Sequence, residues 1–276
     1  MDTKILDLVV TKMKKKEKSE FKSGFYDLDE TLFNIEKGNI IVIGGRPAMG
    51  KTSFAISICI NLLQNNKKIA FFCLDTTKEN LIKKFLINKS KKISEYFIKT
   101  EKDFEEIEKA KKFFKDKKLV IEDKTVISVD EIETKIKEET PDVAFIDYIQ
   151  LIKQPKAANS TEAINLVIQA LKRIARETNT LIVLLSSMSR SVESRIDKHP
   201  ILSDLRNGSL LEEISDVVIL LYRDAYYNAN TDIKNMSEVI IAKNKNGPTS
   251  TIILNCKFGL WENIKRYNGV CRIDED

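Results

Sequence analysis

Two patterns of apolar and polar positions alternate along this chain of 276 residues. Short, unbroken apolar runs are typical of strands that are buried on both faces, and the stretches between them place apolar residues at helical spacing. Strands that alternate with helices predict an α/β fold, in which a mostly parallel central sheet is flanked by helices. The strands are expected at residues 40–43, 68–74, 119–121, 143–146, 181–185 and 217–222.

The C-terminal part of the sheet is expected to differ from the rest. The apolar runs 239–242 and 251–254 lie on either side of Asn246-Gly247-Pro248, which is a turn signal between β-rich segments. This arrangement predicts a C-terminal β-hairpin. Helices are expected after Thr52, within 89–118, at 129–137 and from Asn159 to about Glu177.

The first expected strand runs into a glycine-rich turn. The turn reads Gly45-Arg46-Pro47-Ala48-Met49-Gly50-Lys51-Thr52, which matches G-x-x-x-x-G-K-[ST] between a strand and a helix. Backbone N–H groups and the helix N-terminus bind phosphates in such a loop, and Lys51 supplies charge to the β- and γ-phosphates. The Thr52 hydroxyl can ligate Mg²⁺. We therefore predict a nucleoside-triphosphate site; the alternative is a glycine turn followed by a chance Lys-Thr.

Two aspartates follow other expected strands. Asp147 ends the run 143–146 and suits the second Mg²⁺ ligand, which phosphate-loop enzymes usually hold at the end of a neighbouring buried strand. Asp75 follows the strand at 68–74 and is the candidate for the base or orienting group of the attacking water. The alternative is that Asp75 caps the next helix.

The composition excludes some classes of protein. No apolar run approaches the roughly 18 residues of a membrane span, and the N-terminus has no apolar signal region, so we expect a cytoplasmic location and no membrane. Four widely spaced cysteines predict reduced thiols, and His199 as the single histidine argues against structural zinc. A net charge of +5 is compatible with a polyanionic partner without establishing one.

Residues 3–17 are expected to form a short amphipathic helix that is marginal by itself. Its apolar stripe therefore needs a surface to pack on, either in its own domain or in a neighbouring subunit. A run of lysines overlaps the end of this helix. The run has two interpretations, a solvated face or linker and a contact to nucleic acid.

Several blocks, in order, resemble the motifs of the DnaB-type replicative helicases, in their C-terminal RecA-like ATPase domain. The resemblance begins with Arg46–Thr52 and continues with Asp147-Tyr148-Ile149-Gln150-Leu151. Its later blocks are 189–195 with 197–200, 203–206, 221–226 and 243–248. It covers roughly residues 22–263 and implies a RecA-like P-loop NTPase. On this basis we expect a linker helix and basic linker at 1–20, the ATPase domain at 21–265 and a tail at 266–276.

The resemblance also implies an assembly and its ligands. The family forms a hexameric ring with ATP and Mg²⁺ at subunit interfaces and single-stranded DNA threaded through the centre. Lys243 and Lys245 would act on the neighbour's nucleotide, and residues 2–17 look like the linker helix that packs on the adjacent subunit. The family's N-terminal domain, which contacts primase, has no counterpart in these residues. Ser187 and Arg223 would contact nucleotide in the same chain. The residues implied to bind DNA are Lys153, Lys156, Arg190, Arg195, Arg206, Asn207 and Gly208.

The chain departs from the family pattern at residues that bear on catalysis. Asp75 stands where the family usually has glutamate, Ser187 replaces its γ-phosphate-sensing glutamine, and Lys245 replaces its finger arginine. In the DNA-facing loop, Asn207 replaces an acidic residue and Gly208 comes one place early. Two functions follow as expectations. The first is an ATP-hydrolysing helicase or translocase that acts on single-stranded DNA in replication, with other replication proteins as further partners. The second is a weakened paralogue that binds nucleotide and assembles as a loader, inhibitor or scaffold.

Overall fold

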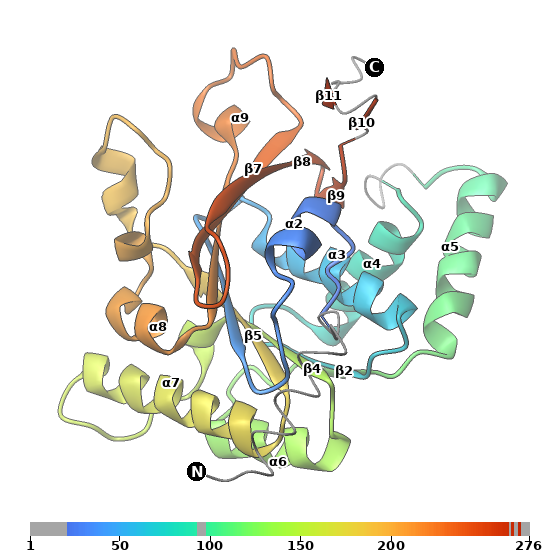
Figure 1. Cartoon of the computed structure of the whole chain (residues 1–276). Helices are drawn as coiled ribbons and strands as arrows, with labels where there is room; N and C mark the ends of the chain where they lie inside the picture. Colours follow the sequence, from blue (N-terminus) through green and yellow to red (C-terminus); the bar gives the residue numbers. More distant parts are fainter. Residues whose placement is uncertain (1–20, 93–97, 265, 268–269, 272–276) are drawn as a thin grey trace, which may run out of the picture.

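One large sheet organises the chain, seen in a computed structural model that describes residues 21–92, 98–264, 266–267 and 270–271 (Figure 1). Among these residues the sheet has nine strands in the order β3-β2-β4-β5-β1-β6-β7-β8-β9. The parallel strands are β1 (Ile40–Gly45), β2 (Ile69–Cys73), β3 (Leu119–Glu122), β4 (Val143–Asp147), β5 (Leu181–Ser187) and β6 (Val217–Tyr222). The antiparallel strands are β7 (Met236–Asn244), β8 (Ser250–Lys257) and β9 (Leu260–Glu262).

The unbroken apolar runs become strands with a helical layer on each side. Every residue of β1, β2, β4 and β6 is buried. Alternate residues of β1 point to opposite faces, so that Ile41 and Ile43 belong to one core while Ile40 and Val42 belong to the other. The expected mostly parallel sheet, its flanking helices and the C-terminal hairpin β7–β8 are therefore confirmed.

Two groups of helices cover the two faces (Figure 1). The first core contains residues of α2, α3 and α4, with the partly buried Phe113 and Phe114 of α5 packed against it. The second core contains residues of α6, α7 and α8. The helices are α2 (Tyr26–Thr31), α3 (Lys51–Gln64), α4 (Lys78–Lys89), α5 (Glu101–Lys115), α6 (Val129–Glu139), α7 (Ser160–Glu177), α8 (Gly208–Ile214) and α9 (Asp224–Tyr227).

Some short elements were not anticipated. They are the helices α2, α8 and α9, the strand β9, the 3₁₀ turns η2 (Ile149–Leu151), η3 (Arg190–Ser194) and η4 (Leu202–Asp204), and the two-residue strands β10 (Arg266–Tyr267) and β11 (Val270–Cys271). The helix expected at 3–17 lies outside the described residues. No helix in the described part of the chain is both long and apolar enough to span a membrane.

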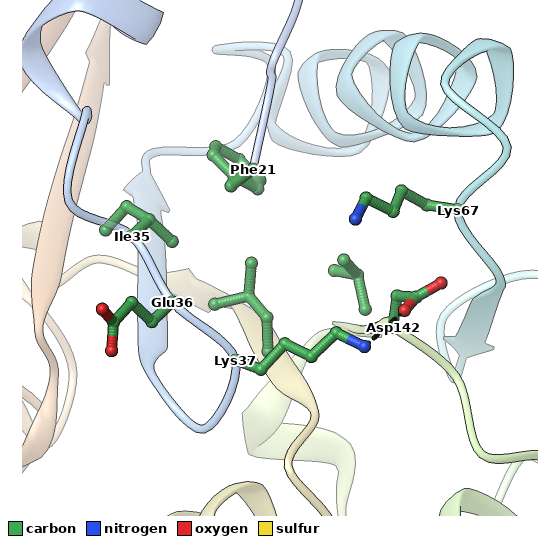
Figure 2. A pocket seen from close by; sticks show the side chains of 8 residues that line it. Phe21, Ile35, Glu36, Lys37, Lys67 and Asp142 are labelled. Atoms are coloured by element: carbon green, nitrogen blue, oxygen red, sulfur yellow. Dashed lines mark ion pairs between the residues drawn. The ribbon is translucent and has the colours of Figure 1, made fainter. Parts of the chain in front are cut away.

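One end of the sheet holds a small crevice. At the amino ends of the parallel strands, a crevice of about 10 Å³ is lined by Phe21, Ile35, Lys37 and Asp142 (Figure 2). The Lys37 ammonium lies 2.6 Å from the Asp142 carboxylate (Figure 2). A volume of that size holds about one water molecule. The crevice is therefore no ligand site, and the candidate chemistry lies at the carboxyl ends of the strands.

Candidate functional site

The glycine-rich turn connects the carboxyl end of β1 to the N-terminus of α3. Gly50 is the residue before α3 and has a φ of 89°, a left-handed conformation that glycine adopts without strain. A Cβ atom at Gly50 would lie 3.0 Å from the Trp261 ring, so the close packing of β9 also requires glycine here. A loop of this kind at the N-terminus of α3 can offer backbone N–H groups and the positive end of the helix dipole to a phosphate.

Lys51 spans this loop from the first turn of α3. Its ammonium donates hydrogen bonds to the carbonyl oxygens of Gly45 at 2.8 Å and Arg46 at 3.2 Å. Burial lowers the pKa of Lys51, and the nearby carboxylates of Asp147 and Asp75 oppose that effect. The side chain is therefore held over the loop, where it can contact the phosphates that the loop binds.

Thr52 and Asp147 form the polar pair that Mg²⁺ binding needs. The Thr52 hydroxyl donates to Oδ2 of Asp147 at 2.6 Å. Asp147 is 4% exposed; burial raises its pKa, and the hydrogen bond from Thr52 and the charge of Lys51 oppose that rise. Asp147 comes from β4, which is separated from β1 by β5. The carboxylate therefore comes from the second strand away in the sheet and not from the adjacent one that sequence reasoning assumed.

These two oxygens suit Mg²⁺ bound together with phosphates. No group of three or more His, Cys, Asp or Glu side chains that could hold a metal occurs among the described residues. Mg²⁺ usually binds nucleotide sites through one or two protein oxygens, with substrate phosphates and water completing its shell. The pair therefore fits a metal that arrives with a nucleotide.

Three other predicted residues of the site, Ser187 and Arg223 for nucleotide binding and Asp75 for the attacking water, lie at the carboxyl ends of parallel strands. Ser187 ends β5 directly opposite Gly45 of β1, and its buried hydroxyl has no hydrogen-bond partner among the described residues. Arg223 follows β6, and its Nη1 donates to the carbonyl oxygen of Ala48 at 3.4 Å. Asp75 is exposed beyond the end of β2. The cap of α4 is Thr77, whose side chain accepts from the N–H of Asn80, so helix capping does not explain Asp75.

Lys243 and Lys245 lie at the other end of the sheet. Because β7 is antiparallel to β6, Lys243 pairs with Val218, and the N–H of Lys245 donates to the carbonyl oxygen of Asp216 at 2.9 Å. Asp216 in turn contacts Ile40, the first residue of β1, and the length of β1 separates this position from the phosphate loop by about 16 Å. The fold therefore does not bring either lysine to the chain's own nucleotide site.

Lys243 also has partners in its own chain. Its ammonium donates to the carbonyl oxygens of Glu212 and, at 2.8 Å, Ser215, which lie at and just after the C-terminal end of α8. A cation at this position stabilises a helix because it satisfies the last carbonyl groups. Lys245 is exposed, and of the two lysines it is the one whose side chain extends into solvent.

The predicted DNA-binding residues occupy two segments that follow β4 and β5. Lys153 and Lys156 are exposed after η2, while Arg190 and Arg206 are exposed after β5. Asn207 is the residue before α8 and has a φ of 60°. Gly208 is the first residue of α8. A Cβ atom on Gly208 would lie 3.1 Å from the Leu202 carbonyl oxygen. Close packing therefore explains this glycine without any ligand.

Arg195 differs from the other candidate cations in being paired inside the protein. Its guanidinium donates to both carboxylate oxygens of Asp204, at 3.0 and 2.8 Å, and to the carbonyl oxygen of His199. Asp204 is only 3% exposed. The bidentate pair links two positions within the loop that are nine residues apart, and this favours a structural role over the predicted contact with DNA.

Sequence reasoning missed several residues that connect the site to its surroundings. Glu193 accepts from Arg46 of the phosphate loop at 2.8 Å and from the Tyr227 hydroxyl at 3.2 Å. Arg46 lowers the pKa of Glu193. Gln150 donates to the Ser186 hydroxyl at 2.9 Å and accepts from the N–H of Ser187. Glu193 and Gln150 stand inside the blocks that carried the resemblance, but no spacing rule identified their partners.

A glycine-rich loop between a buried strand and a helix, with Lys51, Thr52 and Asp147 converging on it, defines a P-loop nucleotide-binding domain. Within that class, the chain belongs to the DnaB-like helicase C terminal domain family, whose sequence model matches residues 21–262. The family membership and the fold class expected from the sequence are therefore confirmed.

Relatives and solved structures agree with this assignment. The chain is 38% identical to the "Probable replicative DNA helicase" of Trieres chinensis over 84% of its own length and 54% of that protein. It is 33% identical to "Replicative DNA helicase DnaB" of Geobacillus stearothermophilus, over 84% of its own length and 53% of that protein. Among solved structures, one described as an ATPase domain superposes with a TM-score of 0.88 at 32% identity, covering 95% of this chain and 98% of that one.

A second solved structure, described as a DnaB-like replicative helicase and its interactions with primase, has a TM-score of 0.86 at 31% identity. The superposition covers 96% of this chain and 67% of that one. The chain thus spans about half the length of the curated relatives it matches.

Proposed function

We propose that this chain is the motor domain of a DnaB-type replicative helicase, which hydrolyses Mg²⁺-bound ATP to move along single-stranded DNA in the cytoplasm. The observation that carries the proposal is the contact of 2.6 Å between Thr52 and Asp147 beside Lys51, in a chain matched to the family over residues 21–262. Lys51 contacts the β- and γ-phosphates, the loop N–H groups hold the chain of phosphates, and Thr52 and Asp147 hold the metal.

The proposal places the nucleotide between subunits of a ring, with a hexamer as the expected size. A ring is a heterologous assembly, so one subunit presents a different surface to each neighbour. Lys245 supports this arrangement because it is exposed at the end of the sheet opposite its own phosphate loop. In a ring it would supply positive charge to the γ-phosphate bound by the neighbour. Lys243 would have to leave the α8 carbonyl groups to do the same.

The proposed DNA path runs along the segments after β4 and β5. Their exposed lysines and arginines (Lys153, Lys156, Arg190 and Arg206) suit phosphate contacts that do not depend on sequence. The contact between Arg46 and Glu193 joins the phosphate loop to the second of these segments. A change at the nucleotide is thereby passed to the DNA-facing side through two adjacent ion-paired side chains.

A weakened paralogue is the second candidate function. The unpartnered hydroxyl of Ser187 favours it, because serine is too short to take over the reach of a glutamine at the end of β5. Lys245 also favours a weakened paralogue, since lysine lacks the planar fork of an arginine finger. Such a protein would bind nucleotide and assemble with hardly any turnover.

The two candidates are separated by ATP turnover and native mass, both measured with and without single-stranded DNA. A motor gives a ring in the presence of ATP and turnover that DNA stimulates. The weakened paralogue gives the ring and tight nucleotide binding, with turnover that stays at background. A chain that binds no ATP would contradict both candidates.

A further inference from the structure

The backbone geometry of the turn between β8 and β9 does not favour the aromatic residue found there, Phe258. Lys257 pairs with Leu260, so the turn consists of Phe258 and Gly259, which have φ values of 52° and 87°. A two-residue hairpin with both φ values positive is a type I′ turn, for which Asn-Gly is the preferred sequence. A bulky aromatic residue is strained in this conformation. Phe258 is also 68% exposed, so packing within the chain does not explain an aromatic residue here.

This turn is fixed directly against the phosphate loop. The indole N–H of Trp261 donates to the Ser53 hydroxyl at 3.1 Å, and that hydroxyl donates to the carbonyl oxygen of Gly50 at 2.9 Å. A Cβ atom on Gly259 would lie 3.4 Å from Cβ of Ser53. Phe54 packs on Trp261 with ring centroids 4.8 Å apart. The hairpin is therefore held at the first turn of α3, next to Thr52.

The direction of a bound nucleotide follows from the site. Lys51 reaches the β- and γ-phosphates, and Asp147 and Ser187 lie on the γ-phosphate side of the loop. The loop and the α3 N-terminus hold the α-phosphate, so the nucleoside extends away from Asp147. The β8–β9 turn contacts Ser53, the residue that follows Thr52 in α3, so the nucleoside would pass close to this turn. Arg223 approaches the loop at Ala48, and its buried Nε has no partner among the described residues.

We propose that the Phe258 ring is the stacking surface for the nucleobase of the bound nucleotide. The inference rests on the proposed nucleotide binding and adds the residue that contacts the base. The strain of the turn then has a function, since strained residues persist where they serve a ligand site. Stacking tolerates every base because every base has a π face, so ATP and GTP are expected to bind with similar affinity.

The test measures affinities for Mg²⁺-ADP and for Mg²⁺-tripolyphosphate, which has the phosphates but no base. The variant Phe258→Asn removes the ring and suits the positive φ, so it is expected to fold normally. It should weaken ADP binding on the order of 10- to 100-fold, the range expected when one stacked base is lost, and leave tripolyphosphate binding unchanged. Phe258→Tyr should bind ADP like the wild type. Phe104→Asn, at another exposed phenylalanine, is the matched control.

The remaining outcomes distinguish this inference from the function on which it rests. Lys51→Ala should weaken both ligands, because it acts on the phosphates. Unchanged ADP affinity in Phe258→Asn, or an equal loss for both ligands, would overturn the stacking role alone. Failure of the wild-type chain to bind either ligand would overturn the proposed nucleotide site, and the stacking role with it.

Discussion

The hydroxyl of Thr52 and the carboxylate of Asp147 are 2.6 Å apart, although 95 residues separate them in the chain. They meet because β4 and the β1–α3 turn reach the same edge of the sheet, with only β5 between their strands. In open parallel sheets, ligands bind at the carboxyl ends of the strands. The contact brings together the two oxygens that we propose as Mg²⁺ ligands.

Asp147→Asn should separate metal-dependent from metal-independent binding. The amide keeps the size of the side chain and its contact with Thr52 but removes the negative charge that attracts Mg²⁺. We expect ATP turnover to fall by about 10²-fold or more, the range for losing one preorganised electrostatic contact. Mg²⁺-ATP affinity should fall, whereas ATP affinity in EDTA should stay the same or rise. Equal losses with and without Mg²⁺ would show that Asp147 is not a metal ligand.

Lys245 provides the test of a site shared between subunits. Lys245→Arg should raise turnover, because guanidinium offers a planar fork to the γ-phosphate, and a finger arginine is worth roughly 10³–10⁵ in kcat. Lys245→Ala should abolish turnover without weakening nucleotide binding. Mixing Lys245→Ala with Lys51→Ala subunits should restore some activity, since one of the two orders at a mixed interface pairs an intact Lys51 with an intact Lys245. Equal turnover for lysine, arginine and alanine would rule out the role.

Arg206 and Arg195 should respond differently to removal of their charge. Arg206 is exposed, so Arg206→Ala should weaken single-stranded DNA binding and reduce the salt slope of log K by about 0.7 with little change in stability. Arg195→Ala removes the charged partner of the buried Asp204 carboxylate, which keeps the hydrogen bond from the N–H of Ile201. It should destabilise the fold by about 3 kcal/mol, since breaking a buried pair is costly. Urea unfolding measures the stability of both variants, and DNA titrations at several salt concentrations measure their DNA binding. A loss of stability in Arg206→Ala together with a loss of DNA binding alone in Arg195→Ala would contradict both assignments.

His199 should make stability depend on pH. Its ring contacts Asp197 at 2.5 Å and Glu238 at 3.1 Å, and it packs against the Tyr222 ring at a tilt of 31°. Burial lowers the pKa of His199, but hydrogen bonds from the ring to the two carboxylates outweigh burial and raise it above its ordinary value. The charged ring therefore stabilises the fold fully below about pH 6.5, and this contribution is lost as pH rises through the folded pKa.

The matched variant for that effect is His199→Gln, which does not titrate. The wild-type advantage in free energy of unfolding should shrink between pH 6 and pH 9, by at most about 1 kcal/mol because the ring is partly exposed. Urea unfolding of both proteins across this range measures it. An advantage that stays constant or grows with pH would contradict the assigned contacts.

The sequence predicted the parts of this molecule that are local or fully buried. Strands such as β4 lie buried on both faces, so Val143 to Ile146 had to be continuously apolar. The phosphate loop was visible because all its residues are adjacent. Short elements such as α8 and β9 were missed because they depend on tertiary packing more than on their own propensity. The Trp261 contact with Ser53, for example, stabilises β9 from across the fold.

The sequence also could not predict which side chains pair when they are far apart along the chain. Arg195 and Arg206 are both arginines in one polar loop, and only the structure distinguishes the guanidinium bound to Asp204 from the exposed one. The separation of Lys245 from its own phosphate loop likewise follows from the antiparallel direction of β7. The resemblance implied a role in trans, and the topology supplies a physical reason for expecting it.

The most direct test of the account is unwinding of a 5′-tailed DNA fork by the wild-type chain and by Lys51→Ala. Lys51 is held over the phosphate loop by the carbonyl oxygens of Gly45 and Arg46. Its replacement therefore removes the positive charge that would face the β- and γ-phosphates, without changing any proposed DNA contact. We predict ATP-dependent unwinding by the wild type and none by Lys51→Ala, which should still bind single-stranded DNA. Absence of Lys51-dependent unwinding at every protein concentration would contradict the account.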